Sequence, residues 1–563
     1  MFFIIPRENG YPFSRLFCAK RGKIKMTVNG DDLMKTLFYG GKIITMAHPL
    51  YTECVITENG IVTAVGSLKE LSEKYAPQEK INLCGAVMIP AFIDSHSHFT
   101  QTAYALLQAD LNGAKSEEEI KQKISDFISR NQIKQGEWII ARGYDHNLFP
   151  QKKNPPLEAL DKIAPDNPLV IQHKSGHMGL FNSSALKELG VDGATSAPQG
   201  GAIESVNGKL TGYMEENAFF EYLKKVPQPS GKKLREAFGN AQKKYASYGI
   251  ATVQDGMAVK EMLPLYRSLA DEKSLYIDLV AYCDVPAFET AEKTLSQNIL
   301  KYENRFKIGG IKIFLDGSPQ GKTAWMKTPY RGSQDHGRST MTDDEVCHAF
   351  ETAAKKGVQI IAHCNGDAAC EQFLNCLEIT EEKYPQLCKL RPVMIHAQFI
   401  TEEQIKRAKN LGVILSFFAA HVYHWGEVHA ENFGFERASQ ISPAKWAEKY
   451  GVLYTFHQDS PVIEPDMAET LWCAVNRTTK SGILLGGEQR ISPEDALKAV
   501  TVNAAYQYFE EDAKGSIEPG KAADFAVLSS DPFACESEEI RNIQVLKTYK
   551  NGKLIFDLKN QNM

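Results

Sequence analysis

Apolar runs of strand length alternate with helical patterns from about residue 250 onward. One further run precedes them. The eight predicted strands are 87–94, 250–255, 276–283, 311–317, 358–367, 392–398, 413–420 and 453–460. Eight strands that alternate with helices are the number that closes a parallel (β/α)8 barrel. We therefore predict an α/β protein built on a TIM-like barrel.

Helix start signals support this alternation. Thr342 with Glu345, and Thr401 with Gln404, have the spacing of a capping box. Ser492 followed by Pro493 places an N-cap residue before a proline at the first helical position. These signals predict helices after the fourth, fifth and eighth runs or their neighbours.

A long insertion separates the first two runs. It is expected at about 101–248, which is far more than one βα connection needs, and it contains the apolar runs WIIARG and PLVIQH. Active sites of such barrels lie at the C-terminal ends of the strands. An insertion after the first strand is therefore expected to cover the site and to influence substrate choice.

The two ends of the chain resemble each other and differ from the middle. Both are rich in β-forming residues, and Asn59-Gly60 and Asn551-Gly552 are hairpin turn signals. We predict a small β-sandwich domain formed by residues 37–86 and 508–560, with the hydrolase barrel between them at 87–507. Residues 1–36 are a poorly specified leader, and it is left open whether residues 1–33 belong to the native protein, since Met26 or Met34 could be the start.

Composition narrows the classes of partner. The formal net charge is −5 and no long Lys/Arg block occurs, which argues against nucleic acid and anionic membranes. Eleven scattered cysteines, an odd number without a Cys-x-x-Cys pair, favour reduced thiols in the cytoplasm. A small molecule is the expected partner, with homo-oligomer formation left open.

Polar residues inside the barrel runs share one position, the C-terminal end or its vicinity. They are His96, His98, Lys312, His363, His396 and Asp459. A single histidine at a strand end is more often an ordinary hydrogen-bonded residue than a ligand. Taken together, however, the four histidines and the aspartate would converge at the mouth of the barrel. Imidazole and carboxylate ligands suit Zn²⁺ or Fe²⁺.

Lys312 is hard to explain as an ordinary core residue, because it lies among Ile311, Ile313 and Phe314. Burial of an ammonium there costs on the order of several kcal/mol. One interpretation is a salt bridge to Asp316. The other is that its amine has added CO₂ to become a carbamate able to bridge two metal ions.

An ordered set of motifs resembles the amidohydrolase superfamily, in the branch of the YtcJ-like proteins and N-substituted formamide deformylases. The resemblance covers roughly residues 37–558. Its motifs are IPAFIDSHSHF, WIIARGYDHNLFP, SGHMGLFNSSAL, GIATVQDG, IKIFLDGSPQGKTAW, IIAHCNGD, MIHAQFI, FHQDSPV and KGSIEPGKAADFAVLSSDP. The chain departs from the family pattern at Ala91, where glycine is usual.

The resemblance implies a role for each predicted ligand. His96 and His98 would hold one metal ion together with Asp459, His363 and His396 would hold a second, and carbamylated Lys312 would bridge them. Members with one metal ion also exist. A metal-activated hydroxide would attack an amide carbonyl, and Asp459 would pass the proton to the departing nitrogen. Asp94 is expected to orient a ligand.

Other residues around this centre are candidate substrate contacts. Tyr144, Asp145 and His177 come from the insertion, and two further groups of three residues follow the fourth and the seventh strand. These further residues are Asp316, Ser318, Gln320, His421, Tyr423 and Trp425. For Tyr423 and Trp425, ordinary packing is an equally good interpretation.

The leading hypothesis is a metal-dependent hydrolase of a non-peptide linear amide, with an N-substituted formamide as the first candidate. Three alternatives remain. A cyclic amide hydrolase or a deaminase could use the same metal centre, a barrel without catalysis could serve binding or assembly, and Lys312 could form a Schiff base in a lyase or isomerase.

Overall fold

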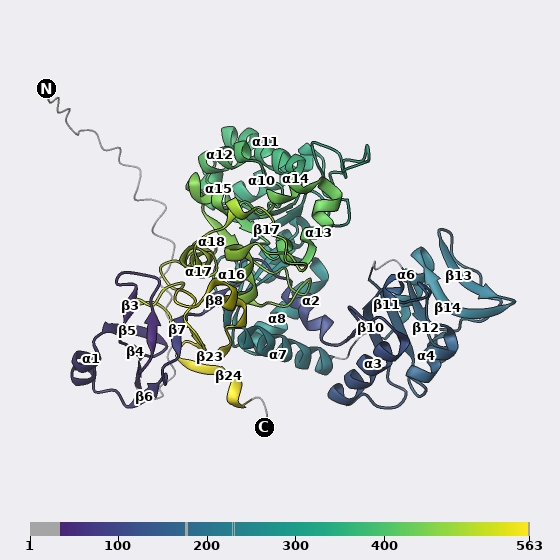
Figure 1. Cartoon of the computed structure of the whole chain (residues 1–563), viewed down its shortest axis with the longest axis horizontal. Coiled ribbons are helices and arrows are strands. Elements are labelled where there is room, and N and C mark those ends of the chain that lie inside the picture. Colours follow the sequence, from purple (N-terminus) through teal and green to yellow (C-terminus); the bar gives the residue numbers. More distant parts are fainter. Residues whose placement is uncertain (1–33, 175–177, 228, 230, 561–563) are drawn as a thin grey trace.

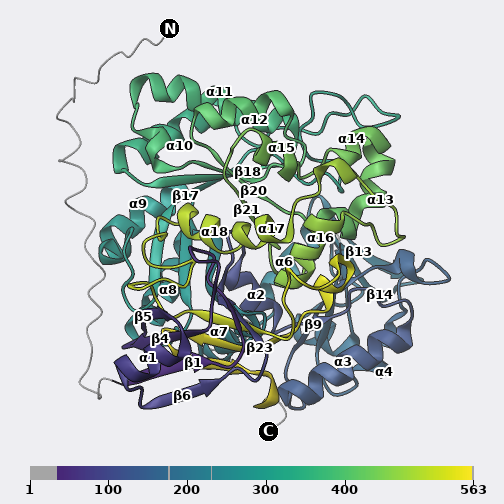
Figure 2. The same cartoon turned by 60° about the vertical axis from the view of Figure 1, so that its left-hand side comes forward.

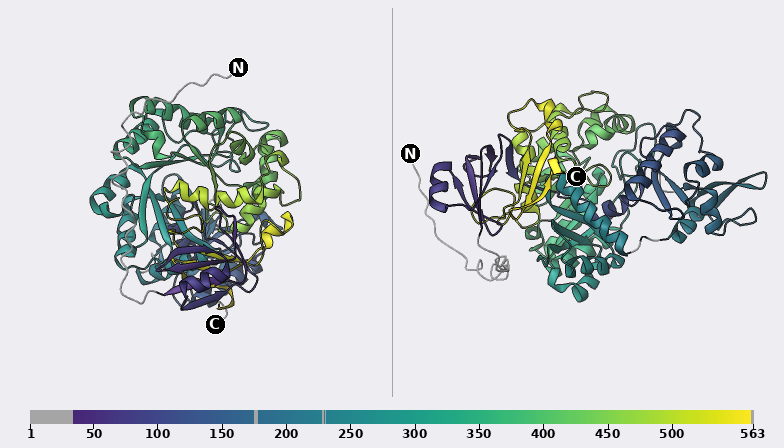
Figure 3. Two further views of the ribbon diagram at one scale, coloured as in Figure 1. Left: turned by 90° about the vertical axis from the view of Figure 1, so that its left-hand side faces the viewer. Right: turned by 90° about the horizontal axis from the view of Figure 1, so that it is seen from below.

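The computed structural model describes residues 34–174, 178–227, 229 and 231–560. Seen from below, three parts lie side by side in a row (Figure 3, right): a small β domain, a central barrel and a lobe formed by the insertion. The first 33 residues of the predicted leader lie outside the described part of the chain. Within it, no helix combines the length and apolar character that a membrane crossing requires, and all ten cysteines are free.

The barrel is a curled sheet of eight strands, all of whose neighbours pair in parallel. In sheet order the strands are β8 (Phe92–Ile93), β15 (Ile250–Ala258), β16 (Asp278–Cys283), β17 (Phe306–Phe314), β18 (Gln359–Cys364), β19 (Val393–His396), β20 (Ile414–Phe417) and β21 (Tyr454–Phe456). Past the end of β8, the Ser95 hydroxyl donates to the Phe456 carbonyl at 2.8 Å, which ties the first strand to the last. The predicted TIM-like barrel is confirmed.

Helices surround this sheet, and Figure 2 shows α9 to α12 curving around its strands. The helices that accompany the barrel are α2 (Phe99–Ala105), α7 (Gly231–Ser247), α8 (Leu263–Asp271), α9 (Val285–Thr294), α10 (Asp343–Lys356), α11 (Asp367–Lys383), α12 (Glu402–Asn410), α13 (His421–Phe433), α14 (Phe435–Ser439), α15 (Ala444–Lys449), α16 (Met467–Asn476), α17 (Pro493–Ala499) and α18 (Val502–Gln507). The predicted start signals are confirmed: Thr342 and Thr401 open capping boxes on α10 and α12, and Ser492 caps α17.

The run 87–94, predicted as one barrel strand, is divided between two sheets. Its first part is β7 (Val87–Pro90), which pairs with strands of the small β domain. Only Phe92–Ile93 pairs with the barrel strand β15. The change occurs at Ala91, whose N–H donates to the Asp524 carbonyl, while the next N–H donates to Gly249. One continuous apolar run therefore serves two neighbouring cores.

Strands from both chain ends form the small β domain (Figure 1, lower left). One sheet has the order β5 (Ile61–Gly66), β4 (Cys54–Glu58), β1 (Lys35–Tyr39), β6 (Glu79–Asn82), and α1 (Leu68–Tyr75) lies beside it. The other has the order β24 (Lys553–Asp557), β23 (Val545–Lys550), β22 (Phe525–Leu528), β7, β2 (Lys42–Ile44), β3 (Tyr51–Thr52). Asn59-Gly60 and Asn551-Gly552 have positive φ at both turn positions, as the hairpin signals predicted.

Buried charges join this domain to the barrel. Asp278, at the start of β16, contacts Lys514, and it accepts from Lys550 at 2.6 Å and from Arg305 at 3.1 Å. Lys514 also lies 2.7 Å from Glu510. Burial alone would raise the pKa of Asp278, but the three cations outweigh burial and hold this pKa well below its usual value.

The insertion forms a lobe with its own core (Figure 1, right). Its sheet has the order β13 (Gly201–Val206), β14 (Lys209–Glu215), β12 (Met178–Phe181), β11 (Leu169–His173), β10 (Ile139–Tyr144), β9 (Ala109–Asp110). The lobe helices are α3 (Glu117–Asn131), α4 (Leu157–Ile163), α5 (Ser183–Glu188) and α6 (Glu216–Lys225). In contrast, α7 packs into the barrel core through Phe238 and Tyr245.

Candidate metal centre

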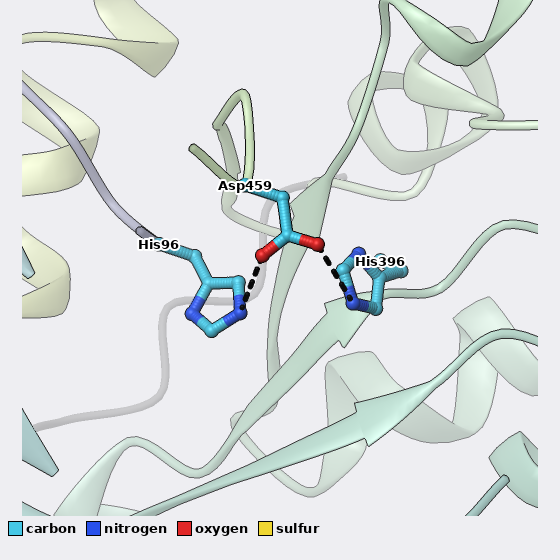
Figure 4. Close-up of side chains that lie close together, drawn as sticks. All are labelled: His96, His396 and Asp459. Atoms are coloured by element: carbon cyan, nitrogen blue, oxygen red, sulfur yellow. Dashed lines mark ion pairs between the residues drawn. The ribbon is translucent and has the colours of Figure 1, made fainter. Parts of the chain in front are cut away.

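The six predicted ligands come from the C-terminal halves or ends of five barrel strands. His96 and His98 follow β8, Lys312 lies near the end of β17, and the other three belong to β18, β19 and the turn after β21. Because parallel strands end at the same rim of a barrel, side chains distant in sequence meet there. Figure 4 shows Asp459 between His96 and His396.

Asp459 lies within contact distance of three imidazoles. Its Oδ1 is 3.3 Å from His96 Nε2 and 3.2 Å from His98 Nε2, and its Oδ2 is 4.0 Å from His396 Nε2. On the other side, His396 Nε2 lies 3.0 Å from His363 Nδ1. Asp459 thus lies among three of the predicted ligand histidines, and the fourth, His363, adjoins His396.

Two of the predicted ligands adopt a backbone conformation that L residues avoid. His396 has φ 73° and Asp459 has φ 55°, both in the left-handed region. Such conformations cost on the order of 1–3 kcal/mol each and cluster at functional sites. At the ends of β19 and β21 they turn the side chains toward the shared point.

The environment of His96 assigns its protons. Gln254, in β15, donates from Nε2 to the Ser95 carbonyl at 2.8 Å and to the Tyr508 hydroxyl at 2.9 Å. Its Oε1 must then accept from His96 Nδ1, which lies 2.6 Å away. In a neutral imidazole this leaves a bare lone pair on Nε2, facing an oxygen of Asp459. Two acceptors that face each other fit a cation bound between them.

Burial keeps three of the predicted ligand imidazoles neutral. It lowers the pKa of His96 and of His363 to about 3, and it lowers the pKa of His396 well below its usual value. Burial alone would raise the pKa of Asp459, but the surrounding imidazoles of His96, His98 and His396 outweigh burial and hold this pKa low. Neutral imidazoles with an ionised carboxylate are the protonation states that a divalent metal ion requires.

Lys312 is buried, and its Nζ makes no hydrogen bond with any described residue. Nζ lies 5.0 Å from the centroid of the Phe314 ring. Burial lowers the pKa of this amine to about 7. The alternative of a salt bridge to Asp316 does not hold, because Asp316 accepts three backbone N–H groups, from Trp325, Asn365 and Gly366.

Two residues of this centre were not predicted as part of it. The first is Gln254, a polar residue in the second apolar run. The second is His457, which is fully buried with its ring centroid 5.1 Å from that of His96 and 5.0 Å from that of His396. Neither ring nitrogen of His457 makes a hydrogen bond with a described residue. Strand alternation places His457 on the same face as Asp459, and that was the available signal.

Asp94 differs from its expected role. Its Oδ1 accepts from the His96 backbone N–H at 3.4 Å, so it contacts the chain rather than an imidazole. The side chain that orients the His96 ring is Gln254. Only the pairing of β8 with β15 shows that Gln254, and not Asp94, contacts the His96 ring.

The candidate substrate contacts after β17 lie in a folded loop. Asp316 is buried, and its three backbone hydrogen bonds hold this loop against β18; burial raises its pKa to about 7. Ser318 and Gln320 are half-buried, and the Ser318 N–H donates to Thr323 Oγ1 at 2.9 Å. Asp316 therefore supports the backbone, while Ser318 and Gln320 remain candidates.

Helix α13 presents two different faces. His421 and Trp425, four residues apart, lie on one side with ring centroids 4.5 Å apart, and Phe418 packs against both. The ring centroid of Phe418 in turn lies 5.2 Å from that of His457. Tyr423 is rotated by about 200° from His421, and it accepts from Arg541 at 3.3 Å and packs on Trp472. His421 and Trp425 thus adjoin the metal centre, whereas Tyr423 faces the other way.

The insertion residues lie in the lobe. Tyr144 donates to Asn154 Oδ1 at 3.1 Å, and Asp145 Oδ1 accepts from the Asn147 N–H at 2.9 Å. Their contacts are thus with lobe residues. His177, the third candidate from the insertion, lies outside the described residues.

Comparisons with known proteins agree with this geometry. The model of the amidohydrolase family matches residues 79–556. YtcJ of Bacillus subtilis strain 168, whose name places it among the amidohydrolases, is 29% identical over 542 residues, covering 93% of this chain and 100% of the relative. N-substituted formamide deformylase of Arthrobacter pascens is 26% identical over 527 residues, covering 90% and 95%.

Solved structures show the same relationship. The crystal structure of an uncharacterised metal-dependent hydrolase from Pyrococcus horikoshii superposes with a TM-score of 0.72 at 26% identity, covering 89% of this chain and 99% of that one. The family match extends over most of the sequence and includes every predicted ligand. This chain belongs to the amidohydrolase family.

Proposed function

We propose that this amidohydrolase hydrolyses a non-peptide linear amide, with an N-substituted formamide as the leading substrate class. The observation that carries the proposal is the position of Asp459 among His96, His98 and His396. The name of the Arthrobacter relative supports the formamide. The aromatic side chains of Phe418, His421 and Trp425 beside the centre would suit an arylalkyl substituent on nitrogen.

The residues present fit a divalent metal ion, most simply zinc. The donor set combines imidazole nitrogens with a carboxylate, and the acceptors of His96 and Asp459 face each other. His96, His98 and Asp459 would hold one ion, and His363 and His396 would hold a second. When bound, the metal acts as a Lewis acid toward the amide carbonyl and lowers the pKa of a water molecule to about 7.

Lys312 would complete the donor set as a carbamate. Its neutral Nζ would add to the carbon of CO₂ and release one proton, which replaces a neutral amine with an anion carrying two oxygen donors. The buried and unpaired Nζ supports this proposal, because an ammonium there would lack a hydrogen-bonding partner among the described residues. A pKa of about 7 leaves a substantial neutral fraction of the amine near neutral pH.

Asp459 would move the proton during hydrolysis. Its carboxylate is ionised and lies at the centre of the site, so it can accept a proton from the attacking water and deliver it to the departing nitrogen. An amine is a poor leaving group without that proton. Gln254 would keep the His96 ring in place throughout.

Three other functions make different predictions. A cyclic amide hydrolase would release a ring-opened acid, and a deaminase would release ammonia. A barrel that only binds or assembles would carry no stoichiometric metal, and His96→Ala would change only its stability. The complete donor set favours catalysis over the last alternative.

The test combines metal analysis of the purified protein with a screen for released amine. Formamides, acetamides, cyclic amides and dipeptides are compared, with Asp459→Asn as the inactive control of the same shape. We expect stoichiometric metal and equal amounts of amine and formate from an N-substituted formamide. Turnover restricted to cyclic amides, heterocyclic amines or dipeptides would contradict the proposal.

A further inference from the structure

A second cluster of metal-ligating side chains lies in the lobe. Asp145, His146 and His173 each offer one ligand atom, and these three atoms lie within 4.8 Å of one another. His173 Nε2 is 3.6 Å from Asp145 Oδ1, and the rings of His146 and His173 have centroids 5.2 Å apart. The ligand atoms of His96, His396 and Asp459 in the barrel also lie within 4.8 Å of one another, so the two clusters have similar spacing.

The lobe sheet brings these side chains together by the same principle as the barrel. Strands β10 and β11 are parallel neighbours, and Tyr144 is in register with His173. Asp145 and His146 directly follow β10, while His173 ends β11. Because parallel strands end at a common edge, polar residues at their C-terminal ends become neighbours. The cluster is therefore a product of the sheet register.

The cluster is partly buried. The His173 side chain is 9% exposed and the Asp145 side chain is 20% exposed. His146 Nδ1 is buried and makes no hydrogen bond within the described ranges. An imidazole lone pair beside a carboxylate is suited to a cation.

The turn after β10 explains only part of this arrangement. Asp145 Oδ1 accepts from the Asn147 N–H at 2.9 Å and from Asn147 Nδ2 at 3.0 Å, which stabilises the short helix His146–Leu148. That turn requires Asp145 but no histidine. It therefore gives no reason for two imidazoles to gather at the same carboxylate.

We propose that Asp145, His146 and His173 form a second binding site for a divalent transition metal ion, separate from the barrel centre. Two imidazoles and one carboxylate form a set that binds Zn²⁺, Fe²⁺ or Co²⁺ and leaves further positions for water or a ligand. Around a tetrahedral ion with bonds of about 2.0–2.1 Å, ligand atoms lie about 3.3 Å apart. Small side-chain rotations would bring the three atoms to that spacing.

The site would bind its metal independently of the proposed catalytic centre. The lobe has its own apolar cores, one of which contains Tyr144 and Ile171 beside the cluster. The exposed Lys174 is the nearest cation to act on Asp145 and His173. Its charge is screened by solvent, so it weakens the site without preventing metal binding.

The test measures metal per chain in the full-length protein rather than activity. The protein is stripped with a chelator, titrated with Co²⁺, and followed by elemental analysis, calorimetry and the visible absorption of bound cobalt. Asp145→Asn is the decisive variant, because asparagine caps a turn as well as aspartate does but lacks the charge. His146→Gln is the second variant, since it alters a side chain that does not hold the turn.

We expect both variants to lose one equivalent of Co²⁺, or to bind it at least about tenfold more weakly, while the barrel equivalents remain. The matched control is Asp192→Asn, whose Oδ1 accepts from a backbone N–H two residues on, at Ala194, in the same way. Wild-type stoichiometry, affinity and spectrum in both variants would overturn the proposal. Loss of the same equivalent in His96→Asn would overturn the separation of the two sites.

Discussion

Gln254 Oε1 accepts a hydrogen bond from His96 Nδ1 at 2.6 Å, and this contact turns the unprotonated Nε2 of His96 toward Asp459. Groups that orient a metal-binding histidine typically contribute 10- to 100-fold in metal affinity or activity, so we expect about that loss for Gln254→Ala. Equilibrium dialysis of the metal measures it. Gln372→Ala, a buried amide that contacts Asp343 far from the centre, is the control. Equal losses in both variants would contradict the assigned role.

His457 is expected to support the same centre. Its buried ring contacts those of His96 and His396, so it is placed either to bind metal or to hold the neighbouring ligands. His457→Asn should weaken metal binding by at least about tenfold and alter the visible spectrum of the cobalt protein. His429→Asn is the matched control, because His429 is equally buried but pairs with His421. An unchanged cobalt spectrum in His457→Asn would show that the ring serves only packing.

Lys312→Ala is expected to lose metal and activity together, by at least about 100-fold in activity. Short carboxylic acids should restore part of both, because they can fill the space of a carbamate. Lys312→Arg should not be rescued, since arginine retains its charge and fills the space itself. Metal analysis and amine release in the presence of added acid measure the effect. Full metal content and turnover in Lys312→Ala would contradict the carbamate.

Acid should destabilise the junction between the barrel and the small β domain. The folded pKa of Asp278 lies below its unfolded value of about 3.9, so the folded state binds fewer protons. Its stabilisation is therefore present above that value and is lost as the pH falls through the folded pKa. Urea unfolding between pH 5 and pH 2 should show a free energy of unfolding that falls once the pH drops below about 4.

Asp278→Asn tests the same junction at neutral pH. It leaves Lys514 and Lys550 buried without their shared carboxylate, and we expect unfolding to become easier by about 3–5 kcal/mol. Glu351→Gln, which removes exposed ion pairs to Lys355 and Lys383, should change little. A similar small effect for Asp278→Asn would show that the buried charges contribute no net stability.

Trp425 is expected to determine preference for the nitrogen substituent. Trp425→Ala should raise KM by about 3- to 10-fold for an N-arylalkyl formamide and much less for an N-methyl formamide, because only the former loses an aromatic contact. Tyr423→Phe, on the other side of α13, is the control and should leave both values unchanged. An equal rise for both substrates in Trp425→Ala would place the tryptophan outside the substituent pocket.

Local sequence was sufficient for much of the fold. Strand alternation put His363 and His396 at the ends of apolar runs, and the turn and capping signals at Asn59, Thr342 and Thr401 held because they depend on nearby backbone groups. The approach of the candidate ligands to one another was also predictable. Polar residues that recur at the ends of parallel strands indicate a shared functional site, and the family resemblance pointed to the same positions.

Other features depended on contacts between distant segments. The run 87–94 is uniformly apolar, so its sequence could not show that Val87–Pro90 pairs with β22 while Phe92–Ile93 pairs with β15. Gln254 and His457 looked like ordinary strand residues until the barrel placed them against His96. Likewise, Asp145 and His173 became neighbours only through the register of β10 and β11.

The physical reason is the range of the interactions involved. The sequence by itself determined periodicity, caps, turns and the strand ends that carry ligands, because each is set by residues a few positions apart. The tertiary structure alone decided which nitrogen of His96 is bare, which side chains hold it, and which polar residues of the lobe share a site. Those outcomes depend on side chains from separate strands, whose distances are set only when the sheets close.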